Sequence, residues 1–395
     1  MARFLINSRR RDLPDWSAPE LAFTGLIRRR AQLPLHQALP GYAPTPLRDL
    51  PGLAAELGLG RLLVKDESGR FGIEAFKGLG ASFAMYVVVR ERWFEATGRQ
   101  LRPEEFADPR VRAILRPVTF TAATDGNHGR AVAWTARQLG QPAVIFMPQD
   151  TAPARIGHIE REGAQVRLVA GTFDDCVAAC AAAAAAEGWQ VIADTAYRGY
   201  LEIPGFIMTG YSTIFVELTA QLDTVPDVLL LPVGVGGLAA AGAVHCVQRH
   251  GAARPRLVCV EPEDSACFLD SLEIGDGEPH AARGRQQSVM AGLNCGVPSL
   301  LAWPVVRDAV DVFLAVEDRW AEKAMRAHHR HGVTSGESGA ATLAGLLALL
   351  QAPELAPARD HLGLGPHTSV LVINTEGATD PQNWARVTAA AEGMP

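Results

Sequence analysis

Lysine is scarce in this chain of 395 residues. Only Lys65, Lys77 and Lys323 occur among the 37 lysines and arginines, so positive charge is supplied almost entirely by arginine. The formal net charge of −6 gives no electrostatic reason to expect a nucleic acid partner. Lysine, unlike arginine, can lose its proton and form an imine with a carbonyl. Each lysine is therefore a candidate for chemistry as well as for surface charge.

Paired cysteines and long apolar runs are also missing. The six cysteines form no Cys-x-x-Cys motif, which excludes a zinc knuckle or disulfide framework and is typical of a reducing cytoplasm. Cys176 and Cys180 are expected to be small buried hydrophobes on one helix face, while the sequence leaves open whether Cys267 and Cys295 meet. No apolar run reaches the ~20 residues of a membrane span, and none follows the basic N-terminus. We therefore expect neither a membrane segment nor a secretory signal.

Short apolar runs alternate with stretches of helical length, which predicts an α/β fold. Runs that are apolar at nearly every position are typical of strands buried on both faces. We expect two open, mostly parallel twisted sheets with helices on both faces. The predicted strands are 61–65, 117–123, 143–148, 165–170, 227–234, 256–262 and 369–377, and the predicted helices are 127–140, 153–162, 172–187, 204–221, 236–250 and 336–351.

The predicted strands fall into two groups along the chain. Residues 117–200 hold a compact series of alternating strands and helices, and the segments on either side supply the rest. We therefore expect a larger cofactor-binding domain made of 1–85 and 205–395 and a smaller α/β domain made of 86–204. The active site is expected in the cleft between them.

Polar or glycine-rich turns follow three strands, at the strand ends where open α/β sheets bind ligands. The turn TDGNHG (124–129) opens a helix and suits an anion such as a carboxylate, with an ordinary helix cap as the alternative. The turn GVGGL (234–238) allows close approach of a phosphate but lacks the spacing of a dinucleotide site or P-loop. Thr375 offers a neutral hydroxyl that either meets a ring nitrogen or caps a turn.

The histidine cluster HHRHG (328–332) invites a metal-binding interpretation. The spacing of its histidines does not place two of them at i and i+4 on one helix face. We expect a solvated helix end there and no metal.

Together, Lys77 and these turns match the needs of a pyridoxal phosphate site. The aldehyde needs a lysine, and the phosphate needs N–H donors. The ring oxygen needs a polar amide, the pyridine nitrogen a tuning group, and the substrate carboxylate a second set of donors.

The order of the motifs AFKGLGA, TDGNHG, GVGGL and NTEG resembles the fold type II pyridoxal phosphate enzymes, the tryptophan synthase β-like group. Within that group, KDESGRFGIEAFKGLG (65–80), ATDGNHG (123–129), ADTAYRGY (193–200) and MAGLNCG (290–296) resemble the diaminopropionate ammonia-lyases. The resemblance implies a carbon–nitrogen lyase with pyridoxal 5′-phosphate as its cofactor. A cytoplasmic homodimer acting on a small amino acid is the corresponding expectation.

The resemblance also assigns roles to individual residues. Lys77 would bond to the cofactor aldehyde, Asn127 would hydrogen-bond the ring oxygen, and Thr375 would face the pyridine nitrogen. Glu337, in GESGAA (336–341), would be a neighbour of the cofactor. The phosphate would be held by backbone N–H groups of Gly234, Val235, Gly236, Gly237 and Leu238. The substrate carboxylate would be received by Thr124, Asp125, Gly126 and His128.

Two aspartates indicate what the site does. Asp125 stands where serine and threonine dehydratases commonly carry serine, and a carboxylate there can act as a base. Lys77 would take the α-proton of the L substrate and Asp125 that of the D substrate. Asp194 either binds the β-amino group or caps a turn. The hypothesis is α,β-elimination of D- and L-2,3-diaminopropionate to pyruvate and two ammonia.

Three other functions compete with this hypothesis. A serine or threonine dehydratase or a β-replacement synthase of the same fold is disfavoured by Asp125. A non-catalytic cofactor-binding protein is disfavoured by the presence of Lys77 and both aspartates. A nucleotide-binding Rossmann protein is suggested by GVGGL alone, and the chain lacks the acidic residue that such a site places on the ribose.

Overall fold

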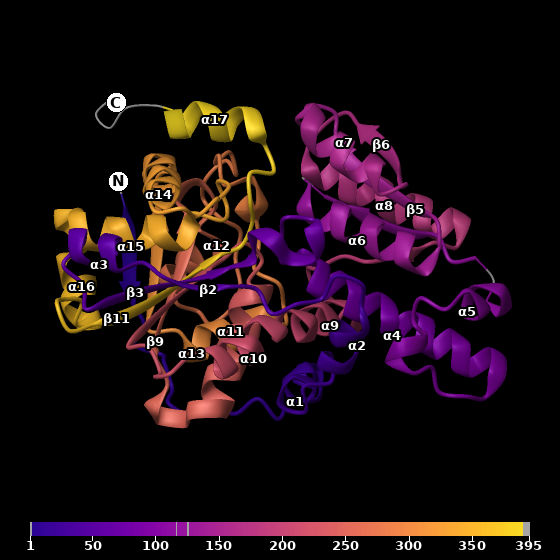
Figure 1. Cartoon of the computed structure of the whole chain (residues 1–395), viewed down its shortest axis with the longest axis horizontal. Coiled ribbons are helices and arrows are strands. Elements are labelled where there is room, and N and C mark those ends of the chain that lie inside the picture. Colours follow the sequence, from indigo (N-terminus) through magenta and orange to yellow (C-terminus); the bar gives the residue numbers. More distant parts are fainter. Residues whose placement is uncertain (1, 116, 125, 390–395) are drawn as a thin grey trace.

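The computed structural model describes residues 2–115, 117–124 and 126–389, and their strands form two sheets (Figure 1). In the larger sheet, the strand at each edge is antiparallel to its neighbour, and the other pairs are parallel. The smaller sheet is parallel throughout. The larger sheet has the order β1 (Arg3–Ile6), β10 (Val312–Val316), β9 (Arg256–Pro262), β8 (Val228–Pro232), β11 (Ser369–Asn374), β3 (Arg61–Asp66) and β2 (Leu47–Asp49). The smaller sheet has the order β6 (Gln165–Val169), β5 (Ala143–Pro148), β4 (Phe120–Ala123) and β7 (Gln190–Val191).

The expected fold class is confirmed, and each of the seven predicted strands is present. The sequence prediction missed β1, β2 and β10, and it gave no limits for β7, the last strand of the series expected over 117–200. It was also wrong to draw one helix over 204–221, because two helices meet at Ser212. The Ser212 hydroxyl donates to Thr209 O at 2.6 Å, a local bond with which serine competes against continuous helix.

The helices vary from single turns to the long α4. They are α1 (Phe23–Arg28), α2 (Leu33–Ala38), α3 (Pro51–Glu56), α4 (Lys77–Thr97), α5 (Pro109–Ile114), α6 (Asn127–Leu139), α7 (Pro153–Arg161), α8 (Phe173–Glu187), α9 (Glu202–Tyr211), α10 (Thr213–Gln221), α11 (Gly237–His250), α12 (Cys267–Ile274), α13 (Ala302–Ala309), α14 (Asp318–Arg330), α15 (Ala341–Gln351), α16 (Ala356–Leu362) and α17 (Pro381–Ala389).

Helices cover both faces of the larger sheet. Because side chains alternate along a strand, Val228 and Leu230 of β8 pack into one core with α3, α14 and α15. Leu229 and Leu231 of the same strand pack into a second core with α4, α9, α11 and α13. Figure 1 shows α14 and α15 on one side of this sheet and α11 and α13 on the other. A small third cluster buries Cys176 and Cys180 of α8 against β5, as the sequence predicts.

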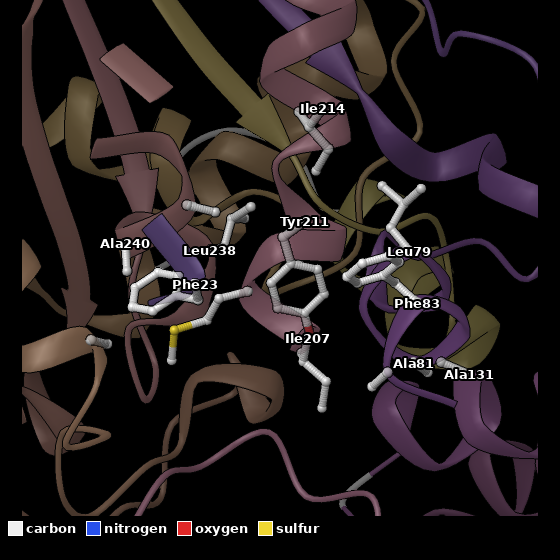
Figure 2. Packing of buried hydrophobic residues seen from close by; sticks show 14 of the residues in the cluster. Phe23, Leu79, Ala81, Phe83, Ala131, Ile207, Tyr211, Ile214, Leu238 and Ala240 are labelled. Carbon is white, nitrogen blue, oxygen red and sulfur yellow. The ribbon is translucent and has the colours of Figure 1, made fainter. Parts of the chain in front are cut away.

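Helix α4 begins beside the larger sheet and extends toward the smaller one (Figure 1). It packs closely on α9, because a Cβ placed on Gly80 would lie 2.5 Å from the Tyr211 ring. A Cβ on Gly210 would likewise lie 2.3 Å from Leu79 O. Figure 2 shows the Tyr211 ring in this packing, between Leu79 of α4 and Leu238 of α11. The first turn of α4 therefore packs closely against α9.

A buried ionic cluster lies just before α4 in the sequence. Lys65 Nζ is 2.7 Å from Glu217 Oε2, and Arg70 NH1 is 2.8 Å from Glu217 Oε1. Arg70 Nε is 2.8 Å from Glu67 Oε2, and none of these four side chains is more than 2% exposed. Two cations and two anions thus neutralise one another in the core.

The histidine cluster in α14 differs from its prediction. His329 is exposed, but His328 is fully buried, and its ring nitrogens have no hydrogen-bond partner among the described residues. Burial lowers the pKa of His328 to about 4. The expectation of a solvated helix end was therefore wrong for His328, because tertiary packing covers one face of the helix end.

No single helix in the described part of the chain combines the length and apolarity that crossing a membrane needs. One helix pair, Ala341–Gln351 with Pro353–Leu362, passes by length and composition together but is bent by 90°.

Candidate active site

The segment before Lys77 is held against the residues that follow β11. Ala75 pairs with Glu376 as an antiparallel bridge, and Phe76 N donates to Thr375 O at 3.2 Å. Phe71 and Glu74 adopt positive φ values of 52° and 57°, which non-glycine residues adopt at a cost. Helix α4 then begins at Lys77 itself, so the lysine projects from the first turn of a tightly packed helix.

Asp194 is the direct partner of Lys77. It follows the short strand β7, and its Oδ2 lies 2.6 Å from Lys77 Nζ. Burial works against the charged amine, but the Asp194 carboxylate outweighs it and raises the pKa of Lys77. Burial likewise opposes the charged carboxylate, and Lys77 and His128 more than offset it and lower the pKa of Asp194. The two groups therefore form a charged pair at neutral pH.

His128 stands behind this pair. Its Nε2 lies 2.6 Å from Ile192 O, and because a carbonyl only accepts, Nε2 carries the proton. Its Nδ1 lies 3.9 Å from Asp194 Oδ2 and has no hydrogen-bond partner among the described residues. Burial lowers the pKa of His128, with Asp194 acting against that shift. The imidazole is thus turned toward Asp194 from the first turn of α6.

The turn expected to receive a substrate carboxylate lies at the N-terminus of α6. Thr124 Oγ1 accepts hydrogen bonds from Gly126 N at 3.0 Å and from Gly129 N at 3.1 Å, which shapes the turn. Arg155 of α7 packs over Gly126, where a Cβ would lie 3.3 Å from its Cδ. Asp125 lies outside the described residues. The structure therefore places Thr124, Gly126 and His128 at the start of α6, directly after β4 of the smaller sheet.

The glycine-rich turn between β8 and α11 forms a cradle. Gly236 has φ of 94°, and a Cβ there would lie 2.4 Å from the Phe268 ring. A Cβ on Gly234 would lie 2.9 Å from Cys295 Sγ. The first N–H groups of α11, which begins at Gly237, have no acceptor within their own helix. Backbone donors thus gather where side chains cannot fit, which suits a phosphate.

Buried groups around the cradle hold it in place. Glu261, fully buried at the end of β9, accepts from Phe268 N at 2.8 Å and Leu269 N at 2.9 Å at the start of α12. Burial raises the pKa of Glu261 to about 8. Cys267 donates to Gly234 O at 3.7 Å, and neither Cys267 nor Cys295 forms a disulfide within the described residues.

The loop after residue 294 joins the cradle to the Asp194 segment. Ser299 N donates to Val235 O at 3.0 Å, and Ser299 Oγ accepts from Ala196 N at 2.9 Å. Leu300 N donates to Ala196 O at 3.0 Å. Ser299 is completely buried. The sequence analysis missed this residue, since nothing local marks a serine that connects two other loops.

Thr375, Asn127 and Glu337 also gather at this end of the larger sheet. Thr375 Oγ1 donates to Ser338 O at 3.3 Å, and Asn127 Nδ2 donates to the Glu376 carboxylate. Glu337 accepts a hydrogen bond from Asn383 Nδ2 and is 3% exposed. Glu376 is the second residue that the sequence analysis missed, although it directly follows Thr375 in the motif NTEG.

This arrangement fits pyridoxal phosphate. The amine of Lys77, a cradle that any Cβ would fill, and the neutral hydroxyl of Thr375 are the groups that its aldehyde, phosphate and pyridine nitrogen need. Among the described residues, no group of three or more His, Cys, Asp or Glu side chains is placed to hold a metal ion.

Comparisons with known proteins agree with this fit. A family model described as pyridoxal-phosphate dependent enzyme matches residues 38–373. The diaminopropionate ammonia-lyase of Salmonella typhimurium is 38% identical over 359 residues, which cover 88% of this chain and 89% of that protein. The crystal structure of holo diaminopropionate ammonia-lyase from Escherichia coli matches with a TM-score of 0.87 and 34% identity, over 98% of this chain and 96% of that one.

A second structure of the E. coli enzyme, in complex with an aminoacrylate-PLP azomethine reaction intermediate, matches with a TM-score of 0.85 and 34% identity. It covers 98% of this chain and 97% of that one. Both the sequence and the structural matches extend over nearly the whole chain, well beyond the motifs. The chain therefore belongs to the pyridoxal-phosphate dependent enzyme family, in the group of the diaminopropionate ammonia-lyases, and its cofactor is pyridoxal 5′-phosphate.

Proposed function

We propose that the chain catalyses α,β-elimination of 2,3-diaminopropionate, in both the D and L forms, to pyruvate and two ammonia. The reaction consumes one water and is balanced without an oxidant or reductant. The observation that carries the proposal is the 2.6 Å pair of Lys77 and Asp194 beside the glycine cradle. The relatives named for this activity, and the E. coli structure with aminoacrylate, support it.

The bound cofactor would supply an aldehyde that captures amines and a ring that accepts the electrons released at the substrate's α-carbon. Lys77 would bond to the aldehyde, and the backbone N–H groups from Gly234 to Leu238 would hold the phosphate. Asn127 would bind the ring oxygen. Thr375, being neutral, would leave the pyridine nitrogen mostly unprotonated, which favours prompt loss of the β-group.

Different residues would bind the two charged groups of the substrate and remove its α-proton. Asp194, already paired with one ammonium group in Lys77, has the charge and position to bind the substrate's β-ammonium group. Thr124, Gly126 and His128, with Asp125, would receive the carboxylate. Lys77 would remove the α-proton of the L form, and Asp125 would remove that of the D form from the opposite face.

We also propose the larger-scale arrangement expected from the sequence. The larger sheet draws on residues 3–66 and 228–374 and the smaller on 120–191, which supports domains of 1–85 with 205–395 and of 86–204 around the site. Helix α4 crosses the boundary at 85, so the transition lies within a helix. A cytoplasmic homodimer without nucleic acid or membrane partners is the accompanying proposal. Light scattering should give twice the mass of one chain.

A pyruvate assay tests the proposed activity. D- and L-diaminopropionate and D- and L-serine would each be supplied to the wild type and to the Lys77→Ala and Asp125→Asn variants. We expect both diaminopropionate forms to yield pyruvate with the wild type, Lys77→Ala to yield none, and Asp125→Asn to keep only the L activity. Loss of the L activity in Asp125→Asn would reverse the two bases. Preference for serine would favour the dehydratase alternative.

A further inference from the structure

Glu376 joins the two sides of the active site through one carboxylate. It lies two residues after the end of β11 of the larger sheet, and it is 4% exposed. Its Oε2 accepts from Asn127 Nδ2, at the start of α6 beside the smaller sheet. Its Oε1 accepts from Ser338 N at 2.9 Å, in the turn that leads into α15. The carboxylate thus connects a residue expected to touch the cofactor with the framework of the larger sheet.

Glu376 is the fixed member of this pair. Its backbone pairs with Ala75, and its carbonyl accepts from Gly336 N at 3.1 Å. A Cβ on Gly336 would lie 2.9 Å from Glu376 Oε1, and a Cβ on Gly339 would lie 2.5 Å from Glu376 O. Neighbouring backbone therefore packs directly against both ends of the residue. The Asn127 side chain must adapt to the carboxylate, because the carboxylate has no room to move.

An ionised carboxylate also decides which end of the Asn127 amide faces it. A carboxylate only accepts hydrogen bonds, so it binds the NH2 group of an amide and turns the amide oxygen away. One N–H of Asn127 is used by Glu376, and a second N–H on the same nitrogen remains. We propose that Glu376 is a positioning residue that fixes the amide of Asn127 so that this second N–H binds the ring oxygen of the cofactor.

The groups around Glu376 show that burying its ionised carboxylate costs free energy. Burial and the neighbouring Glu337 raise the pKa of Glu376, while Arg155 of α7, Asn127 and Ser338 N act in the opposite direction. A buried carboxylate of this kind contributes little net stability, and a neutral side chain of similar shape would often serve the fold as well. A role in orienting Asn127 explains why an acid occupies this position.

The inference rests on the proposed function, because it assumes that Asn127 contacts the cofactor. Its test is a cycle of the wild type, Glu376→Ala, Asn127→Ala and the double variant. Each apoenzyme would be titrated with pyridoxal 5′-phosphate, followed by absorbance and by tryptophan fluorescence. We expect each single change to weaken cofactor binding about tenfold, the usual effect of losing a hydrogen bond to a charged group. The double variant should bind no more weakly than Asn127→Ala alone, because Glu376 acts through Asn127.

Glu376→Gln is the conservative control. Its single amide oxygen can accept from Asn127 or from Ser338 N but not from both in the same geometry, so we expect a cofactor affinity between those of the wild type and Glu376→Ala. The melting temperature of each apoenzyme shows whether a variant loses cofactor affinity because its fold is destabilised. Positioning predicts that the affinity loss in Glu376→Ala exceeds what any drop in its melting temperature explains, and that Glu376→Gln restores part of the affinity.

Two results would overturn the inference. Additive losses of affinity in the double variant would show that Glu376 and Asn127 act independently, with the proposed function unaffected. If Glu376→Ala bound the cofactor as tightly as the wild type, Glu376 would not position Asn127. A wild-type apoenzyme that does not bind pyridoxal 5′-phosphate at all would overturn the proposed function and the inference together.

Discussion

Two lysines lie close together in the sequence and have different surroundings. Lys65 has three hydrogen-bond acceptors: Thr45 O at 2.8 Å, Glu217 Oε2 at 2.7 Å and Gln221 Oε1 at 3.0 Å. An ammonium group has three N–H donors, so Lys65 is fully satisfied. Lys77 has one acceptor among the described residues, Asp194, and its Nζ lies 5.5 and 5.9 Å from the ring centres of Phe76 and Tyr211.

The pKa shifts of the two lysines differ in direction. Burial lowers the pKa of Lys65 despite its acidic neighbours, whereas Asp194 overcomes burial and raises the pKa of Lys77. Lys65 is 0% exposed and Lys77 is 17% exposed. Moving a lysine away from three acceptors costs three hydrogen bonds, whereas a lysine with one partner loses only that bond when it forms a covalent bond to the cofactor. The number of partners therefore separates a structural lysine from a reactive one more clearly than burial does.

The largest effect on activity is expected when Lys77 is replaced. Lys77→Ala should lower pyruvate release by ~10⁴-fold or more, because the group that bonds to the cofactor is lost. Lys65→Met should retain its turnover per folded molecule. Reduction of the wild type with borohydride, followed by peptide mass spectrometry, should place the pyridoxyl group on the peptide containing Lys77. A label on Lys65 or Lys323 would contradict the assignment.

Replacing Lys65 should lower the free energy of unfolding and leave the activity of the folded enzyme largely unchanged. Lys65→Met leaves part of the charge on Glu217 without its partner, and removing one member of a buried ion pair costs about 3–5 kcal/mol. Denaturant unfolding of the apoenzyme measures this loss. The third lysine provides the matched control, since half-buried Lys323 bonds only Gln351 Oε1, at 2.6 Å, among the described residues and lies over the Trp320 ring. Lys323→Met should change stability little, and an equal loss in both variants would remove the distinction.

Asp194→Asn sharpens the comparison by removing the main counter-charge of Lys77. Elimination should slow by about 100-fold, a typical loss for a group that handles protons or binds substrate charge. The pKa of Lys77 should fall, so more of the amine is neutral at a given pH. Incorporation of the cofactor into the apoenzyme should then become faster at neutral pH, while turnover becomes slower. Slower incorporation over the whole pH range would show that Asp194 does not control the charge on Lys77.

A pH-dependent effect is expected at a buried acid that has hydrogen bonds but no counter-charge among the described residues. The pKa of Glu261 is about 8 in the folded protein, above its ordinary value of 4.5. Between these values the folded state binds more protons than the unfolded state, so stability falls as the pH rises. The melting temperature of the wild type, relative to Glu261→Gln, should therefore decrease from pH 5 to pH 8. A constant difference between the two proteins would show that Glu261 is not protonated in the fold.

The parts of the site that could be predicted are those written in contiguous motifs. Lys77 in AFKGLG, the glycines after β8 and Thr375 after β11 lie where the sequence suggested, because each is set by a single strand-to-helix connection. The bond between Asn127 and Glu376 joins residues 249 positions apart, so no local pattern announces it. The burial of His328 and the link made by Ser299 likewise depend on packing between distant segments.

The fold shows the same division. Buried strands such as β5 and β9 were predicted with the correct limits, since their apolar runs end at clear turns. β1 and β2 lie at the edges of the larger sheet and are short and partly exposed, so their composition gives little signal. β10 is fully buried and apolar, and it was missed even though it follows the same rule as the strands that were recognised.

The start of α4 has a mechanical consequence. Lys77 begins α4, which lies in the chain between β3 of the larger sheet and β4 of the smaller one. A group near a rotation axis moves little, so tilting of the smaller sheet about the start of α4 would leave the Lys77 amine almost stationary. Asp194 is hydrogen-bonded to Lys77, and Asn127 to Glu376, so both of these links between the two sheets would have to break before the site could widen.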